Sequence, residues 1–489
     1  MAASHTVENV DFPWSQAKGR REGAQFFLVI AWSLEEPGRI GEVAALAGPV
    51  VLGRGEAQPD DGAPRATFVR QRPGEHAATA PLAGSRISRA QLRLRPRGEE
   101  LEVTSVGRCP LVVRGAVVPS ATVREGDTLV LRNAMVLLVV RRPQAMDPRL
   151  AYPAADFPFG AVDPHGMVGE SPAAWRLRDD LALAARSAHH VLIIGESGVG
   201  KELAARAIHA LSARAAKTLV ARNAATFPEG LVDAELFGTA KSYPHAGSAE
   251  RPGLIGEADG STLLLDEIGE LPPHLQAHLL RVLDAGGEYQ RLGESRLRRA
   301  DLRLVAATNR DPEALKHDFL ARFAARVRVP GLAARAEDVP LLMRHVLDRT
   351  AETTPTVRER FFESRPGKAA HARVDPGLVD ALLHHPFTHH LREIERLLWL
   401  AVSTSRGDFV ALTPEVLAEL ARTTATATTS DDPAAPPPGE EQVRAALAAA
   451  AGNVSRAARQ LGLKNRFALY RLMKKHGLAV PRDDEAGDV

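Results

Sequence analysis

The sequence predicts a multidomain chain: an all-β sandwich, then an α/β unit with an α-helical lid, then a small all-α module. Three observations lead to this prediction. Residues 26–142 consist of short alternating apolar runs broken by Gly, Pro and charge, which is typical of strands. From residue 166 helical patterns alternate with short apolar strands, which is typical of a parallel sheet covered by helices. After residue 332 only helical patterns remain.

Composition and pattern together place the boundaries of the parts. A segment rich in Thr, Ala and Pro near the C-terminus cannot bury a core and is expected to be a linker. The expected parts are an N-terminal extension (1–25), the sandwich (26–142), a linker (143–165), the α/β unit (166–331), its helical lid (332–421), a second linker (422–440) and the all-α module (441–480).

Bulk composition limits the function classes. The chain has 489 residues and a net charge of +2, so any binding to nucleic acid must come from a local basic surface. Its one cysteine, Cys109, excludes an intramolecular disulfide framework, and no signal-peptide pattern opens the sequence. No apolar stretch approaches the roughly 20 residues that span a bilayer. We therefore expect a cytoplasmic protein with no membrane segment.

A phosphate-binding loop follows the apolar strand 191–194 and precedes a helix. Its glycines let backbone N–H groups face phosphate oxygens, the helix N-terminus adds its dipole, and Lys201 reaches the terminal phosphates. Glu202 stands where most such loops carry Ser or Thr for magnesium, so the metal shell must be completed elsewhere. The expected ATP-binding residues of this loop are Gly195, Glu196, Ser197, Gly198, Val199, Gly200, Lys201 and Glu202.

A second apolar strand, over residues 261–265, ends in two carboxylates, Asp266 and Glu267. Asp266 is suited to hold Mg²⁺, and Glu267 to orient or deprotonate the attacking water. The order of loop and acidic pair along the chain predicts an ATP-hydrolysing site with ATP and Mg²⁺ as its ligands.

These motifs, with DAELFG (233–238), LLRVLDAGGEYQRLG (279–293) and LRLVAATNRDP (302–312), resemble the central AAA+ domain of bacterial enhancer-binding proteins, the sigma-54 activators. The resemblance covers residues 167–402. It implies a P-loop ATPase that assembles as a homo-oligomeric ring, hexamer or heptamer, with its site between subunits. It assigns Asn223 as a switch residue, Asn309 and Arg392 as sensors of the nucleotide, and Arg322 as an arginine finger; Lys316 stands at the companion finger position.

The loop that touches the sigma factor in this family reads GAFTGA. Here the corresponding span consists of Ser242, Tyr243, Pro244, His245, Ala246 and Gly247. The proline also restricts the backbone of this span. Two alternatives follow: the loop still contacts the sigma-54 form of RNA polymerase, or the protein acts on another holoenzyme or another partner.

The segments 51–55, 87–92 and 125–131 resemble a forkhead-associated (FHA) domain, a β-sandwich that binds phosphothreonine peptides. The resemblance places Arg54 and Ser88 on the phosphate, with Arg89 as a second cation. Two positions depart from the family: Gln91 replaces its histidine, and its asparagine falls at or near Cys109. The alternative is a scaffold that no longer binds phosphopeptides.

The tail predicts three short helices, over 441–450, 454–461 and 466–475, joined by turns that contain glycine. It resembles the Fis-type helix-turn-helix of the same regulators, which implies a dimer that reads inverted half-sites. The residues expected to face DNA are Asn465, Arg466, Tyr470, Arg471, Lys474 and Lys475.

The four histidines His384, His385, His389 and His390 include an i, i+4 pair that would suit zinc on a helix. Pro386 interrupts the helix that would present them, so we expect no metal there.

The predicted function is ATP-dependent control of transcription from an upstream DNA site, with a phosphothreonine protein as input and RNA polymerase as target. Two alternatives stay open. One is a DNA-binding regulator that acts without sigma-54, and the other is a DNA-tethered AAA+ remodeller of another protein.

Overall fold

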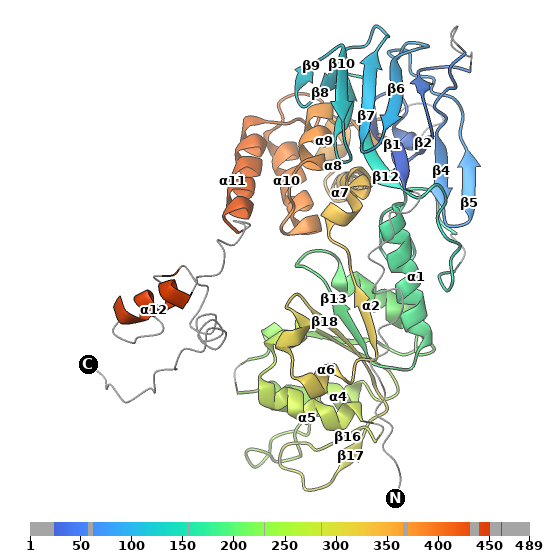
Figure 1. Ribbon diagram of the computed structural model, residues 1–489. Coiled ribbons are helices and arrows are strands. Elements are labelled where there is room, and N and C mark those ends of the chain that lie inside the picture. The colour runs from blue at the N-terminus through green and yellow to red at the C-terminus, as the bar shows by residue number, and fades with distance from the viewer. Residues whose placement is uncertain are drawn as a thin grey trace, which may run out of the picture. The chain divides into compact units, whose positions relative to one another are not determined.

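The computed structural model describes residues 24–56, 62–153, 156–228, 230–284, 286–364, 370–430, 440–449 and 461. Two compact units divide the chain at residue 420. The first holds the sandwich, the α/β unit and the lid (Figure 1). None of the helices in these described ranges is long and apolar enough to cross a membrane.

Two antiparallel sheets form the N-terminal sandwich, as predicted. The larger has the strand order β5 (Glu75–Ala78), β4 (Val69–Arg72), β2 (Val43–Leu46), β1 (Gln25–Ser33), β12 (Met135–Arg142), β11 (Thr128–Leu131), β8 (Leu111–Val113), β9 (Ala116–Val117). The smaller has the order β10 (Ser120–Val123), β7 (Glu100–Ser105), β6 (Leu92–Arg97), β3 (Val50–Leu52).

Both faces of the central strands β1 and β12 are buried. Successive side chains of a strand point to opposite faces. On β1, Phe26 and Leu28 face the interior of the sandwich, whereas Phe27 and Val29 belong to the core that the lid helices share. This explains why β1 is apolar along nearly its whole length. The sandwich and the lid are therefore joined by a common hydrophobic core.

The α/β unit is built on a parallel sheet with the order β14 (Val220–Asn223), β15 (Thr262–Asp266), β18 (Arg303–Thr308), β13 (Val191–Ile194), β19 (Ala325–Arg328). The strand predicted at 191–194 is confirmed as β13. The helices of this unit are α1 (Pro172–Arg186), α2 (Lys201–Ala210), α3 (Val232–Phe237), α4 (Gly253–Glu257), α5 (Pro273–Leu283) and α6 (His317–Leu320). A hairpin of β16 (Glu288–Tyr289) and β17 (Arg298–Arg299) follows α5.

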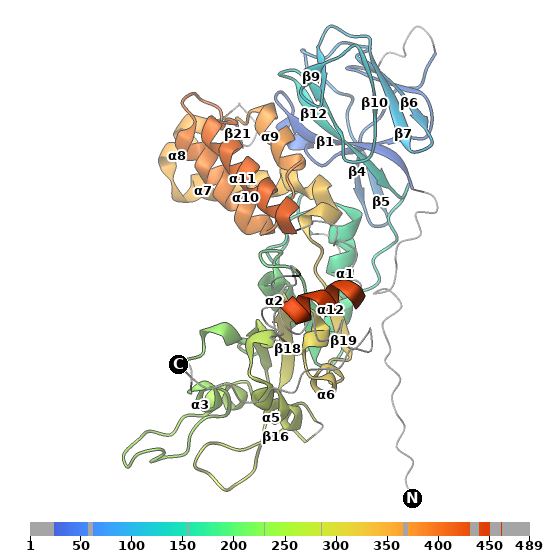
Figure 2. The ribbon, with the colours of Figure 1, turned by 60° about the vertical axis from the view of Figure 1, so that its left-hand side comes forward.

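A 3-10 segment, η5 (Leu332–Asp338), leads from the sheet into the lid. The lid consists of α7 (Val339–Thr353), α8 (Pro355–Phe361), α9 (Pro376–Leu383), α10 (His390–Thr404) and α11 (Pro414–Ser430), which gather into one bundle (Figure 2). A two-stranded hairpin, β20 (Phe362–Glu363) with β21 (His371–Ala372), adds strands to a region that the sequence predicted as purely helical. Helix α11 also continues nine residues beyond residue 421, into the segment expected to be a linker.

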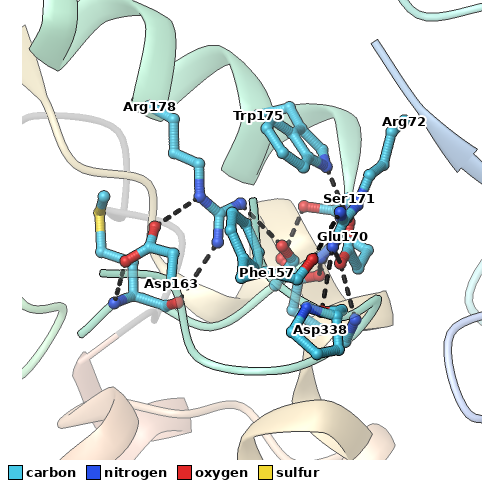
Figure 3. Close-up of polar contacts among 12 residues, drawn as sticks. Arg72, Phe157, Asp163, Glu170, Ser171, Trp175, Arg178 and Asp338 are labelled. Atoms are coloured by element: carbon cyan, nitrogen blue, oxygen red, sulfur yellow. Dashed lines mark hydrogen bonds and ion pairs between the residues drawn. The ribbon is translucent and has the colours of Figure 1, made fainter. Parts of the chain in front are cut away.

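The segment 143–165, predicted as a linker, packs against α1. Tyr152 and Phe157 are buried against Trp175 of α1, and the carboxylate of Asp163 pairs with Arg178 at 2.8 Å in a site where both side chains are almost fully buried (Figure 3). The sequence signal for this packing was the presence of aromatic residues in an aperiodic segment, because aromatic side chains bury a large apolar area.

The second unit comprises residues 421–489. Within it the structure describes the end of α11, the helix α12 (Glu440–Ala449) and Leu461. The six residues predicted to face DNA, between 465 and 475, lie outside the described residues.

Candidate functional site

The phosphate-binding loop joins β13 to the N-terminus of α2. Gly198 and Gly200 have φ angles of 81° and 102°, which L side chains rarely adopt. A Cβ atom at Gly198 would lie 2.2 Å from the carbonyl oxygen of His389, so only glycine fits beneath the lid. Lys201 is buried, and its ammonium donates to the carbonyl oxygens of Gly195 at 3.0 Å and Glu196 at 3.1 Å. The buried ammonium of Lys201 therefore ties together the backbone of the loop.

The acidic pair lies at the carboxyl end of β15, in the same sheet as β13. Asp266 ends β15, and one of its carboxylate oxygens accepts the backbone N–H of Glu267 at 2.9 Å. Glu267 has a φ of 53°, a left-handed conformation that is strained for a non-glycine residue and is common at functional sites. Its carboxylate lies 3.9 Å from the ammonium of Lys201. The two motifs predicted to act together are therefore brought together.

Asn223 and Asn309 lie at the ends of β14 and β18, the two strands that flank β15. Asn223 is opposite Asp266 in the register of β14 and β15, but its side-chain oxygen accepts the N–H of Ala225 at 2.8 Å. Asn309 follows β18 and lines an open cleft with Gly195 and Glu196. Both asparagines are at strand ends that point to the phosphate loop, as expected for parallel strands.

The start of lid helix α10 is in direct contact with the phosphate loop. The backbone N–H of Leu391 donates to the carbonyl oxygen of Gly198 at 3.2 Å, and the guanidinium of Arg392 lies 3.3 Å from the hydroxyl of Ser197. Lid and loop therefore meet at the position predicted for the second sensor.

His390 was not among the predicted nucleotide-binding residues, yet it is the buried polar group of this contact. Its Nδ1 atom accepts the N–H of Leu332 at 3.3 Å, so Nε2 carries the proton and donates to the carboxylate of Glu196 at 2.7 Å. The residue has a φ of 49°. No sequence pattern links two residues that are 194 positions apart.

A neighbouring histidine, His385, contacts the N-terminal end of α10. The carboxylate of Glu393 accepts hydrogen bonds from His385 Nε2 at 2.8 Å and from the N–H groups of Thr388 and His389. Burial alone would raise the pKa of Glu393, but these hydrogen bonds outweigh it and hold the pKa below its usual range. His385 and His390 thus form hydrogen bonds to carboxylates. Within the described residues no cluster of three or more metal-ligating side chains is found.

The arginine predicted as a finger makes an ion pair with a residue outside the phosphate loop. Arg322 pairs with Asp284 at 2.9 Å, and its side chain is half exposed. The backbone N–H of Lys316, at the companion position, donates to the side chain of Gln276 at 3.2 Å. Within the part of the chain that the structure describes, no contact joins either side chain to residues 195–202.

Comparison with known proteins supports the resemblance seen in the sequence. The family model described as "Sigma-54 interaction domain" matches residues 167–329. The transcriptional regulatory protein ZraR of Escherichia coli (strain K12) is 37% identical over 327 residues, which cover 65% of this chain and 71% of ZraR. The chain belongs to the sigma-54-dependent transcriptional regulator family.

Two further relatives are similar to this chain, one over a shorter part of its length and one at lower sequence identity. The anaerobic nitric oxide reductase transcription regulator NorR of Escherichia coli (strain SMS-3-5 / SECEC) is 38% identical over 296 residues, covering 58% of this chain and 54% of NorR. A crystal structure of NtrX from Brucella abortus in complex with ATP is 28% identical with a TM-score of 0.44, covering 64% of this chain and 69% of NtrX.

In this sigma-54-dependent regulator, the span 242–247 that was predicted to contact the partner follows residues bound to the hairpin of β16 and β17. The N–H of Ala240 donates to the carbonyl oxygen of Leu292 at 2.9 Å, and the N–H of Leu292 donates to that of Gly238 at 3.0 Å. The ring of Tyr243 packs on Gly293, where a Cβ atom would lie 2.4 Å from the ring. The loop therefore holds an aromatic side chain against the hairpin in the span where other family members carry Phe-Thr-Gly.

The three residues expected to grip a phosphate lie together on one end of the sandwich. The N–H of Arg54 donates to the carbonyl oxygen of Ser88 at 3.0 Å, and the guanidinium groups of Arg54 and Arg89 are exposed. Arg65 was missed by sequence reasoning. Its guanidinium donates to the carbonyl oxygens of Arg89 at 2.9 Å and Arg54 at 3.4 Å, and so ties the two loops together.

Gln91 has a bracing role at the position of the missing histidine. It is fully buried, and its amide donates to the carbonyl oxygen of Cys109 at 2.7 Å while its carbonyl accepts the N–H of Ser88 at 3.2 Å. The hydroxyl of Ser88 accepts the N–H of Arg108 at 2.9 Å. Gln91 therefore connects the loop that carries Ser88 to the loop that carries Cys109.

Proposed function

We propose that this regulator hydrolyses ATP and uses the energy to control transcription, with DNA bound through its C-terminal module. The observation that supports this most is the convergence of Lys201, Glu267 and the lid residue His390 around one phosphate loop. ATP supplies the driving force, the buried ammonium and loop N–H groups bind its phosphates, and Glu267 orients the attacking water.

A magnesium ion fits the donor set. Asp266 uses one oxygen for the N–H of Glu267, which leaves the other free to bind a cation directly or through water. Glu202, at the position of the usual loop hydroxyl, forms an exposed ion pair with Arg206 at 2.7 Å on the surface of α2.

The half-exposed Arg322 supports assembly into a hexameric or heptameric ring. A guanidinium that is half exposed and held by one exposed carboxylate is accessible to a neighbouring subunit, where it would stabilise charge in the transition state. Sigma-54 RNA polymerase is the first target to consider, because the family interacts with it. The replaced contact loop favours a second candidate, which is another holoenzyme or a protein partner remodelled while the chain is tethered to DNA.

Open-complex formation separates these targets. Purified sigma-54 holoenzyme on a sigma-54 promoter would be mixed with ATP and either the wild type or the Lys201→Ala variant, while ATP hydrolysis is followed in parallel. Hydrolysis with promoter opening by the wild type alone supports sigma-54 as the target. Hydrolysis without opening assigns the ATPase to another partner, and no hydrolysis by the wild type refutes the proposal.

His390 gives a prediction on nucleotide affinity. Changing it to Asn removes the hydrogen bond to Glu196, while Asn tolerates the left-handed backbone well. A hydrogen bond to a charged group contributes about 1.5–3 kcal/mol, and less here because the Glu196 side chain is 70% exposed. We expect the KM for ATP to rise about three- to ten-fold with kcat little changed. His189→Asn, at an exposed position, is the matched control.

We also propose that the sandwich receives a phosphothreonine signal. Arg54→Ala is expected to weaken binding of a phosphothreonine peptide library by about ten-fold or more, since a charge-assisted bond to the phosphate is lost. Fluorescence anisotropy with phosphorylated and unphosphorylated libraries measures this. Arg97→Ala, at the end of β6 in the smaller sheet, serves as the control. Equal binding of both libraries by the wild type would contradict the sensor function and favour a scaffold.

A further inference from the structure

The sandwich reaches the hinge of the ATPase through a buried arginine. Arg72, at the end of β4, is 8% exposed and makes a bidentate ion pair with Glu170, with Nη2 to Oε1 at 2.6 Å and Nε to Oε2 at 3.1 Å. Its guanidinium also donates to the carbonyl oxygens of Phe157 at 3.0 Å and Pro158 at 3.2 Å. The contact therefore joins the sandwich to the segment just before α1.

Glu170 is completely enclosed by this contact (Figure 3). One carboxylate oxygen also accepts the N–H of Gly160 at 2.7 Å, and the other accepts the indole N–H of Trp175 at 3.0 Å. The guanidinium of Arg72 lies 4.6 Å from the ring centre of Phe157 and 5.4 Å from that of Trp175. Each carboxylate oxygen of Glu170 therefore accepts two hydrogen bonds, which compensates for the burial of its charge.

The backbone of Glu170 is bound to the lid. Its N–H and the N–H of Ser171 both donate to one oxygen of Asp338, at 2.8 Å and 2.9 Å, and the hydroxyl of Ser171 donates to the other at 2.6 Å. Asp338 ends η5 and directly precedes α7. The same residue pair thus fixes the start of α1 and the start of the lid.

The segment η5 continues this chain of contacts to the phosphate loop. The guanidinium of Arg335 donates to the carbonyl oxygen of Val199 at 3.3 Å, and the N–H of Leu332 is bound by His390. The sandwich holds η5 from a second side, where Arg142 pairs with Glu337 at 2.6 Å. Arg72 and Arg142 both come from the sandwich, and both contact residues at the junction between sheet and lid.

Net stability is a poor explanation for these buried charges. The sandwich and the lid already share a large apolar core, and a buried ion pair is often no more stabilising than apolar residues of equal size. A planar guanidinium held by four acceptors does fix orientation, because each bond is directional. We propose that Arg72 is a positioning residue of the ATPase, which sets the geometry of the lid hinge through Glu170 and Asp338 and so carries the state of the sandwich to the nucleotide site.

This inference rests on the proposed ATPase function. When the hinge is loosened, the lid closes over the loop in a smaller fraction of molecules, and apparent nucleotide affinity falls by that fraction. Arg72→Gln is expected to raise the KM for ATP about ten-fold and to leave kcat nearly unchanged. A merely structural role would instead reduce the amount of active protein, which lowers kcat at constant KM.

Arg70→Gln is the matched control. Arg70 lies two residues earlier on β4, is 43% exposed at its side chain, and pairs with Glu42 inside the sandwich. It should leave both constants unchanged. Glu170→Gln should reproduce the effect of Arg72→Gln, and the double variant should be no worse than either single one, because both remove the same link. Arg72→Lys keeps the charge without the fork and should restore only part of the affinity.

Amide hydrogen exchange of the full-length protein tests the hinge without ATP. Faster exchange in residues 332–338 of Arg72→Gln, with unchanged exchange in β13, supports the inference. If the wild type hydrolyses ATP and Arg72→Gln matches it in KM and in exchange, the inference is wrong and the proposed function stands. If the wild type does not hydrolyse ATP, the proposed function fails, and the exchange result alone decides whether Arg72 controls the hinge.

Discussion

Replacing Glu267 by Gln is expected to slow ATP hydrolysis by about 100-fold or more while ATP still binds. General-base assistance contributes about 10²- to 10⁴-fold, and the amide keeps the size of the side chain but cannot take a proton. Binding persists because Lys201 and the N–H groups of the loop are untouched. Steady-state hydrolysis and titration with a fluorescent nucleotide measure the two effects.

The control for this variant is Glu270→Gln, three residues further along the chain. Glu270 pairs with Arg310 at 2.5 Å and has no contact with Lys201 among the described residues. It should hydrolyse ATP at the wild-type rate. Undiminished hydrolysis in Glu267→Gln would show that another group activates the water.

Asp163→Asn is expected to destabilise the first unit by about 3 kcal/mol, because it leaves a buried guanidinium without its counter-charge. The side chains of Asp163 and Arg178 are 0% and 1% exposed. The guanidinium keeps its bonds to the carbonyl oxygens of Gly169 at 2.8 Å and Met167 at 3.3 Å, but these carry no full charge. The shift of the urea unfolding midpoint, at constant slope, measures the loss.

Asp301→Asn provides the comparison. It breaks an ion pair of the same chemical type, with Arg214 at 2.7 Å, but the Asp301 side chain is 81% exposed. Water screens such a pair, so its loss should cost less than about 1 kcal/mol. Equal midpoints for the two variants would mean that burial does not govern the strength of these pairs.

The nucleotide site was largely predictable because most of its residues lie in short contiguous segments of the sequence. A loop such as 195–202 must combine glycines, a lysine and a following helix within a few residues, and the strand ending in Asp266 carries its own signature. The chain order of the two motifs was enough to infer that they meet. The structure brings Lys201 and Glu267 to 3.9 Å.

Contacts between distant segments could not be predicted in this way. Arg72 and Glu170 are 98 residues apart, and neither stands in a pattern that distinguishes it from a surface charge. The bracing role of Gln91 was missed for the same reason, since its partner Cys109 is 18 residues away along the chain. Local periodicity reports which elements form, whereas these polar pairs depend on how the elements dock.

The shared core of sandwich and lid limits how these regulators can be recombined. Phe27 and Val29 of β1, with Val136 of β12, bury against lid helices, so separation of the two would uncover apolar surface on both. A sandwich transplanted from another protein would therefore need its lid, or a redesigned lid surface, to be transplanted with it. We expect substitutions on either side of this core to need compensating substitutions on the other side.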